Sequence, residues 1–451
     1  MNTENDALLG TDERPRGFRE VLRRNVRWQL PPVLLIGAII AWIDRSNLGV
    51  AAPFLQDDLG ISPSTMGVIL GSYAFVLIFM HPFAAWLVDK LGDPRLLFFG
   101  SAIAWFVFTS ATALARGAVS LFTLRFLLAV GEAPQASCAL KATSQWFPRR
   151  ERALAIGTYE VGSEFGGAIA VPLVTALIAG LGWRGSFVVT GLMGLVFAFF
   201  WLSFYRTPRK HAKVTVGELQ HIEDGGGHVT DTAAQRAVRW LDLFRYRTVW
   251  GLIIVMFCRT STIFFFITWY PTYLVDERGF SLLELGLYGA IPGLVAIAGD
   301  LLGGWFSDYL VRRGTSPTLA RKAPIMAGLL AGTVIAPAAL VSSPAAALVL
   351  LSVASAGVAF CTGALYSLPL EVAPTPGNAV SLSGLMRAGG LVGGAVVPIL
   401  IGFVYEAAGS FVLPLVLVGG ILAVVVVVLL VVVGRAEPLP LKGAVALSRP
   451  Q

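Results

Sequence analysis

Long apolar stretches recur along the whole of this 451-residue chain. A membrane-spanning helix needs about 20 predominantly apolar residues, and about twelve stretches of that length can be found. Their centres lie near Ile40, Phe75, Phe106, Leu128, Ala168, Val196, Phe264, Val295, Leu330, Ser355, Val396 and Val425. A membrane-spanning strand would instead alternate in polarity over about 10 residues, and no stretch does so. The sequence therefore predicts an all-α membrane protein with twelve transmembrane helices.

Charged side chains interrupt these apolar stretches. Insertion scales put the cost of one such charge near the bilayer centre at roughly 2.5–3.5 kcal/mol, so a charge at this depth indicates function by default. Four are arginines and five are acids: Arg45, Arg125, Arg259, Arg387, Asp44, Glu132, Glu160, Glu164 and Asp300. Their near balance predicts a polar path through the middle of a helical bundle.

The composition agrees with a membrane protein. The chain is 56% hydrophobic and 14% charged, whereas soluble domains usually carry about 25% charged residues. The net charge of +7 is spread over the loops, which favours loop orientation in a lipid bilayer over nucleic-acid binding. Cys138, Cys258 and Cys361 all fall in apolar stretches, so we expect no disulfide framework, no metal site and no bound cofactor.

Lysines and arginines concentrate in alternate loops. The clusters lie at Arg23–Arg27, Lys90–Arg95, Arg149–Arg152, Arg206–Lys213, Arg236–Arg247 and Arg312–Lys322. By the positive-inside rule, both termini and the long middle loop face the cytoplasm. The predicted organisation is an N-terminal arm (1–27), a six-helix bundle (28–205), a cytoplasmic linker (206–247), a second six-helix bundle (248–434) and a cytoplasmic tail (435–451).

The two halves resemble each other, because Ala85–Leu91 after the second stretch is echoed by Gly304–Leu310 after the eighth. Two six-helix repeats around a central site are typical of the major facilitator superfamily of transporters, which this chain resembles. The family signature G-x-x-x-D-[RK]-x-G-[RK]-[RK] is matched with two departures, at Ala85 and at Asp93-Pro94. The resemblance implies a gating loop, and its candidate residues are Asp89, Lys90, Gly92, Arg95 and Asp308.

Further motifs resemble the anion:cation symporter family within that superfamily. They include Asp44-Arg45-Ser46-Asn47-Leu48, the pair Arg125 and Glu132-Ala133-Pro134, Trp146-Phe147-Pro148, Gly182-Trp183-Arg184 and Thr268-Trp269-Tyr270-Pro271. The likeness is strongest to bacterial sugar-acid/proton symporters of the galactonate and hexuronate type. It is more distant to sialin and the vesicular glutamate transporters.

The first of these motifs supplies a candidate anion ligand. The guanidinium of Arg45 offers a fixed fork of donors that suits a carboxylate, and in the similar transporters the matching arginine holds the substrate carboxylate. The alternative is a structural ion pair with Asp44. Asp44 points about 100° away around the helix, so we expect it to meet a different partner. By resemblance it is a proton-binding acid.

Arg125 and Glu132 are seven residues apart, so both face the same side of their helix. A carboxylate in a dry site takes up a proton readily unless it is paired. The resemblance makes Glu132 the coupling acid, and we expect Arg125 to hold it charged in one state and release it in another.

Other polar residues are candidate substrate ligands: Arg387, Tyr73, Ser163, Glu164, Asn47 and Ser367. Arg387 departs from the similar galactonate carriers, in which an asparagine is usual. Together with Arg45 it could grip a dicarboxylate or a second anionic group, while Glu160 or Glu164 could meet an amine. In the alternative, Arg387 neutralises Glu164 and a single anion site remains.

These features predict a secondary transporter of the inner membrane that imports a small organic anion, such as a sugar acid, with protons. A single chain is expected to form the pathway. The main alternative is an exporter or antiporter of an organic or aromatic acid. A membrane enzyme or sensor is remote, since we find neither a nucleophile–base pair nor H-E-x-x-H spacing, nor a sizeable soluble output domain.

Overall fold

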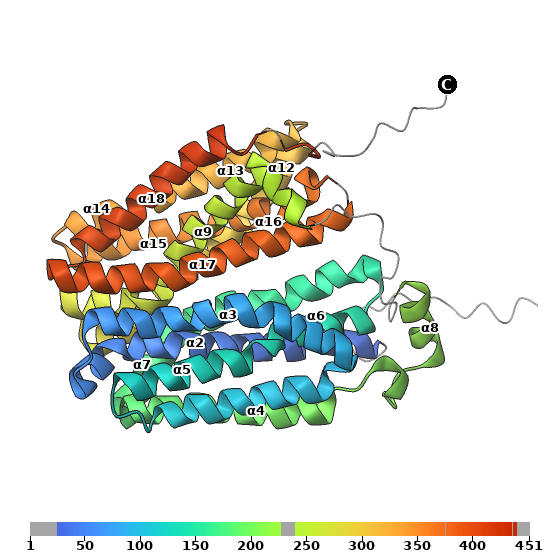
Figure 1. Ribbon diagram of the computed structural model, residues 1–451, viewed down its shortest axis with the longest axis horizontal. Coiled ribbons are helices and arrows are strands. Elements are labelled where there is room, and N and C mark those ends of the chain that lie inside the picture. The colour runs from blue at the N-terminus through green and yellow to red at the C-terminus, as the bar shows by residue number, and fades with distance from the viewer. Residues whose placement is uncertain (1–24, 227–239, 375, 435, 440–451) are drawn as a thin grey trace, which may run out of the picture.

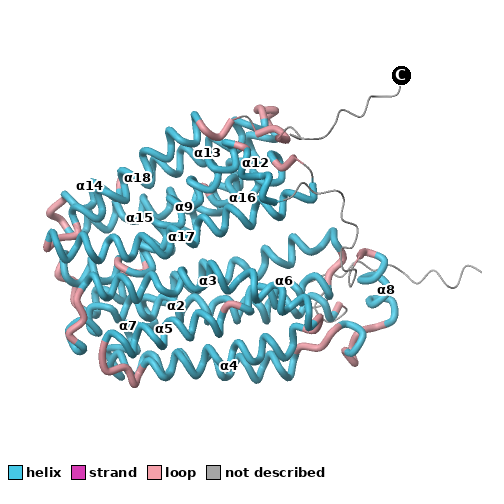
Figure 2. The backbone as a smooth tube through the Cα atoms, in the orientation of Figure 1, coloured by secondary structure: helices cyan, strands magenta, loops and turns pink. Residues whose placement is uncertain are grey.

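The computed structural model describes residues 25–226, 240–374, 376–434 and 436–439, and the regular structure in these ranges is entirely helical (Figure 2). The all-α prediction is thus confirmed. Most of the predicted N-terminal arm and of the C-terminal tail lies outside the described residues.

The N-terminal half begins with a 3-10 turn, η1 (Val26–Gln29). Its α-helices are α2 (Leu30–Leu59), α3 (Pro63–Leu91), α4 (Pro94–Thr112), α5 (Ala118–Glu132), α6 (Pro134–Trp146) and α7 (Arg149–Phe204). Gly182 has non-helical angles (φ 70°, ψ 171°), so α7 consists of two helices that meet at this residue. The short helices α5 and α6 follow each other across Ala133 and together make one crossing.

After the linker helix α8 (Val216–Asp224), the second half is built from helices and helix pairs. They are α9 (Arg247–Thr268), α10 (Tyr270–Thr272), the π-helix η4 (Tyr273–Glu277), α11 (Leu282–Tyr288), α12 (Ile291–Arg312), α13 (Pro317–Gly332), α14 (Ile335–Leu340), α15 (Pro344–Phe360), α16 (Thr362–Val372), α17 (Pro376–Ala408) and α18 (Val412–Val431). Two further 3-10 turns, η2 (Pro208–Lys210) and η3 (Trp240–Arg245), lie within the predicted linker, before and after α8.

Ten helical stretches in the described residues are long and apolar enough to cross a membrane. One of them, Arg150–Phe204, contains both helices of α7, and α5 with α6 adds a crossing whose two pieces are each too short to qualify alone. Counted in this way, the structure has the twelve crossings that the sequence predicts.

Local sequence explains where several helices begin. A serine followed by proline starts α3 and α15: the side chains of Ser62 and Ser343 accept hydrogen bonds from backbone N–H groups three residues on. Proline suits the first helical position because its missing N–H would have no intrahelical acceptor there. Asp93 caps α4 in a related way, by accepting a bond from the N–H of Arg95 (2.9 Å). The departure Asp93-Pro94 from the family signature is therefore a helix start.

The two halves lie side by side, with α2 to α7 in one and α9 to α18 in the other (Figure 1). Between them α3 packs on α17, α7 on α11 and α12, and α2 on α9 and α10. A Cβ on Gly67 would lie 2.6 Å from the carbonyl oxygen of Pro398, and one on Gly402 would lie 2.5 Å from that of Pro63. These contacts bring the backbones of α3 and α17 together at the end of the bundle opposite α8, which we call the far end.

A carboxylate joins the halves at the same place. Glu406 near the end of α17 accepts a hydrogen bond from the backbone N–H of Ser64 in the first turn of α3 (2.8 Å). The N-terminus of a helix favours a negative charge, so this bond adds to the tight packing of the far end.

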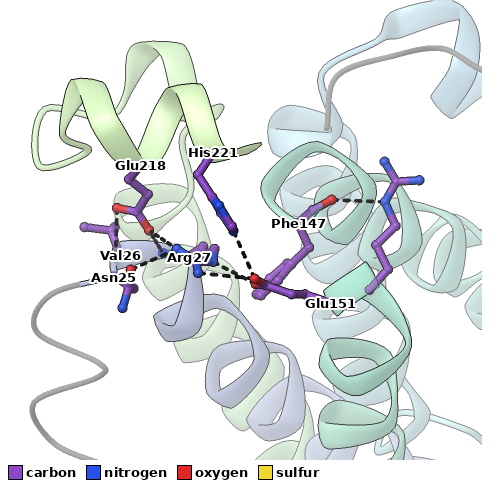
Figure 3. A network of polar contacts seen from close by, with 8 residues as sticks. Asn25, Val26, Arg27, Phe147, Glu151, Glu218 and His221 are labelled. Carbon is purple, nitrogen blue, oxygen red and sulfur yellow. Dashed lines mark hydrogen bonds and ion pairs between the residues drawn. The ribbon is translucent and has the colours of Figure 1, made fainter. Parts of the chain in front are cut away.

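At the other end, α8 is bound to the N-terminal half (Figure 3). Glu218 accepts hydrogen bonds from the backbone N–H groups of Val26 and Arg27, at 3.1 and 3.0 Å. The Arg27 guanidinium bonds Glu151 at the start of α7 (2.9 Å), and Glu151 also contacts His221 of α8 (3.0 Å). The predicted linker thus contains a helix that is fixed to η1, just before α2, and to the first turn of α7.

Candidate substrate and proton site

The centre of the N-terminal half holds an ion pair between α2 and α5. Arg45 donates from Nη2 and Nε to the same oxygen of Glu132, Oε1, at 2.6 and 3.1 Å. Its Nε also donates to the Tyr73 hydroxyl of α3 (2.6 Å). Three helices therefore bring together three residues that the sequence singles out.

Exposure within this ion pair is uneven. The Arg45 side chain is 28% exposed, whereas that of Glu132 is 2% exposed. Among the described residues Nη1 of Arg45 has no hydrogen-bond partner, and neither does the second, buried oxygen of Glu132. A ligand can thus approach Arg45 from its open side while Glu132 lies behind it.

Arg125 does not pair with Glu132 in this conformation, and its pairing with Glu132 in another state stays a prediction. Its Nη2 donates to the backbone carbonyl of Arg45 (3.3 Å), and its guanidinium lies 4.6 Å from the centre of the Tyr73 ring. Seven-residue spacing puts two side chains on one helix face, but it does not determine which residue of a neighbouring helix bonds each of them. Of the two arginines, Arg45 bonds Glu132 here.

Asp44 faces a different neighbour from Arg45, as predicted. Its Oδ2 accepts a hydrogen bond from the hydroxyl of Thr109 on α4 (3.1 Å), while Oδ1 is buried without a partner. Asp44 and Arg125 line one small cavity of about 10 Å³, close to the space that a single water needs. Their shared cavity has an otherwise largely apolar wall: Leu48, Thr109, Thr112, Leu121, Leu128 and Phe187.

The polar residues of the C-terminal half form a second group around Thr362 and Tyr366 of α16. Arg259 on α9 donates to the Thr362 hydroxyl (2.6 Å) and to the carbonyl of Val358 (3.3 Å). The guanidinium of Arg259 lies 5.8 Å from the centre of the Tyr366 ring.

Arg387 on α17 lies 5.2 Å from the centre of the same Tyr366 ring. It is exposed, and within the described ranges it forms no ion pair or hydrogen bond. The carboxylates of Glu160 and Glu164 likewise form no ion pair there. The alternative in which Arg387 neutralises Glu164 is therefore absent from this conformation.

Three weaker ligand candidates bond within the protein. Asn47 is fully buried and binds two residues of the second α7 helix, donating to the Thr190 hydroxyl (2.9 Å) and accepting from that of Ser186 (3.1 Å). Ser163 and Ser367 donate to carbonyls one turn earlier in their own helices. Their roles as substrate ligands stay predictions.

In the predicted gating loop, Asp89 bonds Lys141 of α6 (3.0 Å) and Lys90 lies over the Trp86 ring (4.9 Å). Gly92 has φ 73°, which favours glycine, and Arg95 donates to the carbonyl of Leu202 in α7 (2.7 Å).

The matching residue of the second half, Asp308, lies 3.7 Å from Arg321 of α13, which also bonds Glu371 (2.6 Å). Both loop aspartates, Asp89 and Asp308, therefore meet a cation of their own half. Their part in gating stays a prediction.

Known proteins resemble this chain over most of its length. The family profile described as Major Facilitator Superfamily matches residues 34–385. A probable sulfoacetate transporter of Cupriavidus necator is 35% identical, covering 89% of this chain and 93% of that protein. The D-galactonate transporter of Escherichia coli is 34% identical, covering 84% and 89%.

A similar fold is found among solved structures. A bacterial homologue of the human lysosomal transporter Spinster, in an inward-facing and unoccupied conformation, has a TM-score of 0.72. The match covers 90% of this chain and 95% of that one at 20% sequence identity, so it bears on the fold alone.

Proposed function

The chain belongs to the major facilitator superfamily of membrane transporters, and we propose that it imports a small organic anion together with protons. It is a multi-pass membrane transporter and not an enzyme. Its relatives include a probable sulfoacetate transporter and a galactonate transporter, which supports an organic acid as the substrate class. We place it in the inner membrane with both termini and α8 on the cytoplasmic side, and a single chain forms the pathway.

The bond between Arg45 and Glu132 carries this proposal. An ionised Glu132 occupies two donors of the guanidinium and cancels its charge, so an incoming anion must compete with it. A proton on Glu132 removes that competition and leaves Arg45 free for the anion. Proton and anion then each bind better when the other is present, which is the reciprocal coupling that symport requires.

The proposed cycle begins with the far end open to the outside. Glu132 and Asp44 take up protons, and the anion binds Arg45. The halves then rock, so that the far end closes and the α8 end opens. The protons leave to the cytoplasm, Glu132 regains Arg45, and the anion is released. The present conformation, with a tightly packed far end and a re-formed ion pair, fits the state after release.

Neighbouring side chains position the ligand arginine. Tyr73 accepts a bond from Nε of Arg45, and Arg125 bonds the Arg45 carbonyl while lying over the same tyrosine ring. Asp44, held by Thr109 and facing Arg125, serves as a second proton site. Proton movement in this scheme uses carboxylates and no bound cofactor.

Uptake into proteoliposomes tests the proposal. Labelled hexonates, hexuronates, aldarates, sialic acid and acidic amino acids are each offered with and without an inward proton gradient. We expect the gradient to drive accumulation of at least one acid above equilibrium. Accumulation that ignores the gradient would refute proton symport. Net outward movement of a preloaded acid driven by inward protons would instead support the exporter reading.

A further inference from the structure

Arg387 is the interior arginine whose donors are least engaged. Arg45 bonds Glu132 and Tyr73, and Arg259 bonds Thr362 and a carbonyl. Arg387 contacts the face of Tyr366, a contact that holds a guanidinium by its plane and leaves its N–H edges available. No bond to any of those N–H groups occurs in the described part of the chain.

The position of Arg387 on α17 places it on the face that packs against the N-terminal half. Leu391, one turn further along α17, packs against the buried cluster that contains Tyr73 and Leu77 of α3. Residues four apart share a helix face, so Arg387 lies on the side of α17 that faces the N-terminal half. Tyr73 in turn accepts the hydrogen bond from Nε of Arg45 (2.6 Å), so Arg387 lies one helical turn from a residue that packs against this part of the N-terminal site.

The nearby acids leave Arg387 free. Neither Glu160 nor Glu164 forms an ion pair in the described residues. An exposed cation of the C-terminal half thus lies on the helix face turned toward the N-terminal half, which carries Arg45, the candidate anion ligand. A ligand that binds both Arg45 and Arg387 must therefore bridge the interface between the two halves.

We propose that Arg387, seated on Tyr366, is a second anion subsite, and that the transporter selects organic acids with two anionic groups. This inference rests on the proposed function, because it takes Arg45 as the ligand of the first group. One carboxylate binds Arg45 in the N-terminal half, and the second carboxylate or sulfonate accepts hydrogen bonds from Arg387 in the other half. A monoanion of the same length satisfies only one of the two guanidinium groups.

The test compares two acids of equal length, a hexonate with one carboxylate and an aldarate with two. Uptake kinetics and ligand-induced thermal shifts are measured for the wild type, Arg387→Gln, Arg387→Lys and Arg184→Gln. The last is a matched control, because Arg184 is an exposed arginine near the far end whose partner is Asp58.

We expect the wild type to have a lower KM for the aldarate. Arg387→Gln should reduce the ratio of aldarate to hexonate kcat/KM by ~10-fold or more, because a second charged group is left without its charge-assisted ligand. Arg387→Lys should keep part of the preference, since it retains the charge and loses the fork. Arg184→Gln should leave the ratio unchanged.

An equal loss for both acids in Arg387→Gln, with an unchanged melting temperature, would overturn the second subsite. So would a wild type that prefers the hexonate. If the wild type imports either acid in response to the proton gradient but does not discriminate, the further inference fails and the proposed function stands. If neither acid nor any other on the panel responds to the gradient, the proposed function fails.

Discussion

The interior arginines of the two halves are used in opposite ways. In the N-terminal half, Arg45 is bonded to a nearly fully buried glutamate, and Arg125 bonds its backbone. In the C-terminal half, Arg387 is exposed on an aromatic ring and bonds no acid of the described chain. A paired arginine can be released by a proton, whereas an unpaired one is ready for an anion at any pH. On this basis we propose that the N-terminal half couples transport to protons and the C-terminal half selects the substrate.

Replacing Arg45 with Gln should have the largest effect. The anion loses its ligand and Glu132 loses its ion-pair partner, so initial uptake rates should fall by ~100-fold or more for every transported acid. Arg184→Gln, which removes an exposed guanidinium near the far end, is the control for expression and charge. A rate for Arg45→Gln above one third of the wild-type rate would exclude Arg45 as the anion ligand.

Glu132→Gln should separate transport from its driving force. The neutral amide cannot carry the proton, so accumulation driven by a pH gradient should fall by ~10-fold or more, while exchange of anion for anion persists. Accumulation equal to that of the wild type under the same gradient would remove Glu132 from the coupling role.

Tyr366→Leu tests whether the Tyr366 ring positions Arg387. Without the ring the guanidinium loses a contact of about 0.5–1 kcal/mol at an exposed site, so the preference for two-charge acids should fall ~2- to 5-fold. Tyr366→Phe keeps the ring face and should lose less of the preference than the leucine variant. Equal preference in the leucine variant and the wild type would show that the ring does not position Arg387.

Thr109→Val should have an effect as small as that of Tyr366→Leu, because it removes a single hydrogen bond to Asp44 and nothing from either arginine. A hydrogen bond from a neutral donor to a charged acceptor contributes about 1.5–3 kcal/mol to stability. Asp44, however, lies beside a cavity in which a water molecule can replace the lost hydroxyl. We expect proton-driven uptake to fall only ~2- to 5-fold, as measured by initial rates.

Thr123→Val, at an exposed position of α5, is the matched control for this prediction. A loss of ~10-fold or more in Thr109→Val, as large as that expected for Glu132→Gln, would contradict the assignment of Asp44 as the second of the two proton sites.

Much of the architecture could be predicted from the sequence. Runs of about 20 apolar residues have few stable folds other than membrane-spanning helices, since every backbone group must find its partner within the segment. The same reasoning identifies Arg45 and Glu132 as functional candidates. A charge in an apolar run costs free energy of insertion, so its presence indicates a function. Asp44 and Arg45 meet different partners, as their angle around one helix requires.

Two features could not be predicted from the sequence: the docking of α8 and the role of Asp93-Pro94 as a helix start. Thr215 and Glu218 have the spacing of a helix N-terminus, and Thr215 indeed caps α8, yet a polar linker gives little reason to expect a docked helix. Asp93-Pro94 looks like a defect in the loop signature until its capping of α4 is seen. In both cases the capping residue can be recognised in the sequence, but the packing of the helix that it begins cannot.

The sequence by itself determined the helices, their number and the charges that they carry into the membrane, because hydropathy and the cost of a buried charge are local quantities. Only the tertiary structure decided how those charges are shared: Arg45 rather than Arg125 at Glu132, and Arg387 over Tyr366 without an acid. Partner choice depends on distances of a few ångströms between helices that are far apart in the chain. Those distances follow from how the two halves pack, which spacing within one helix does not encode.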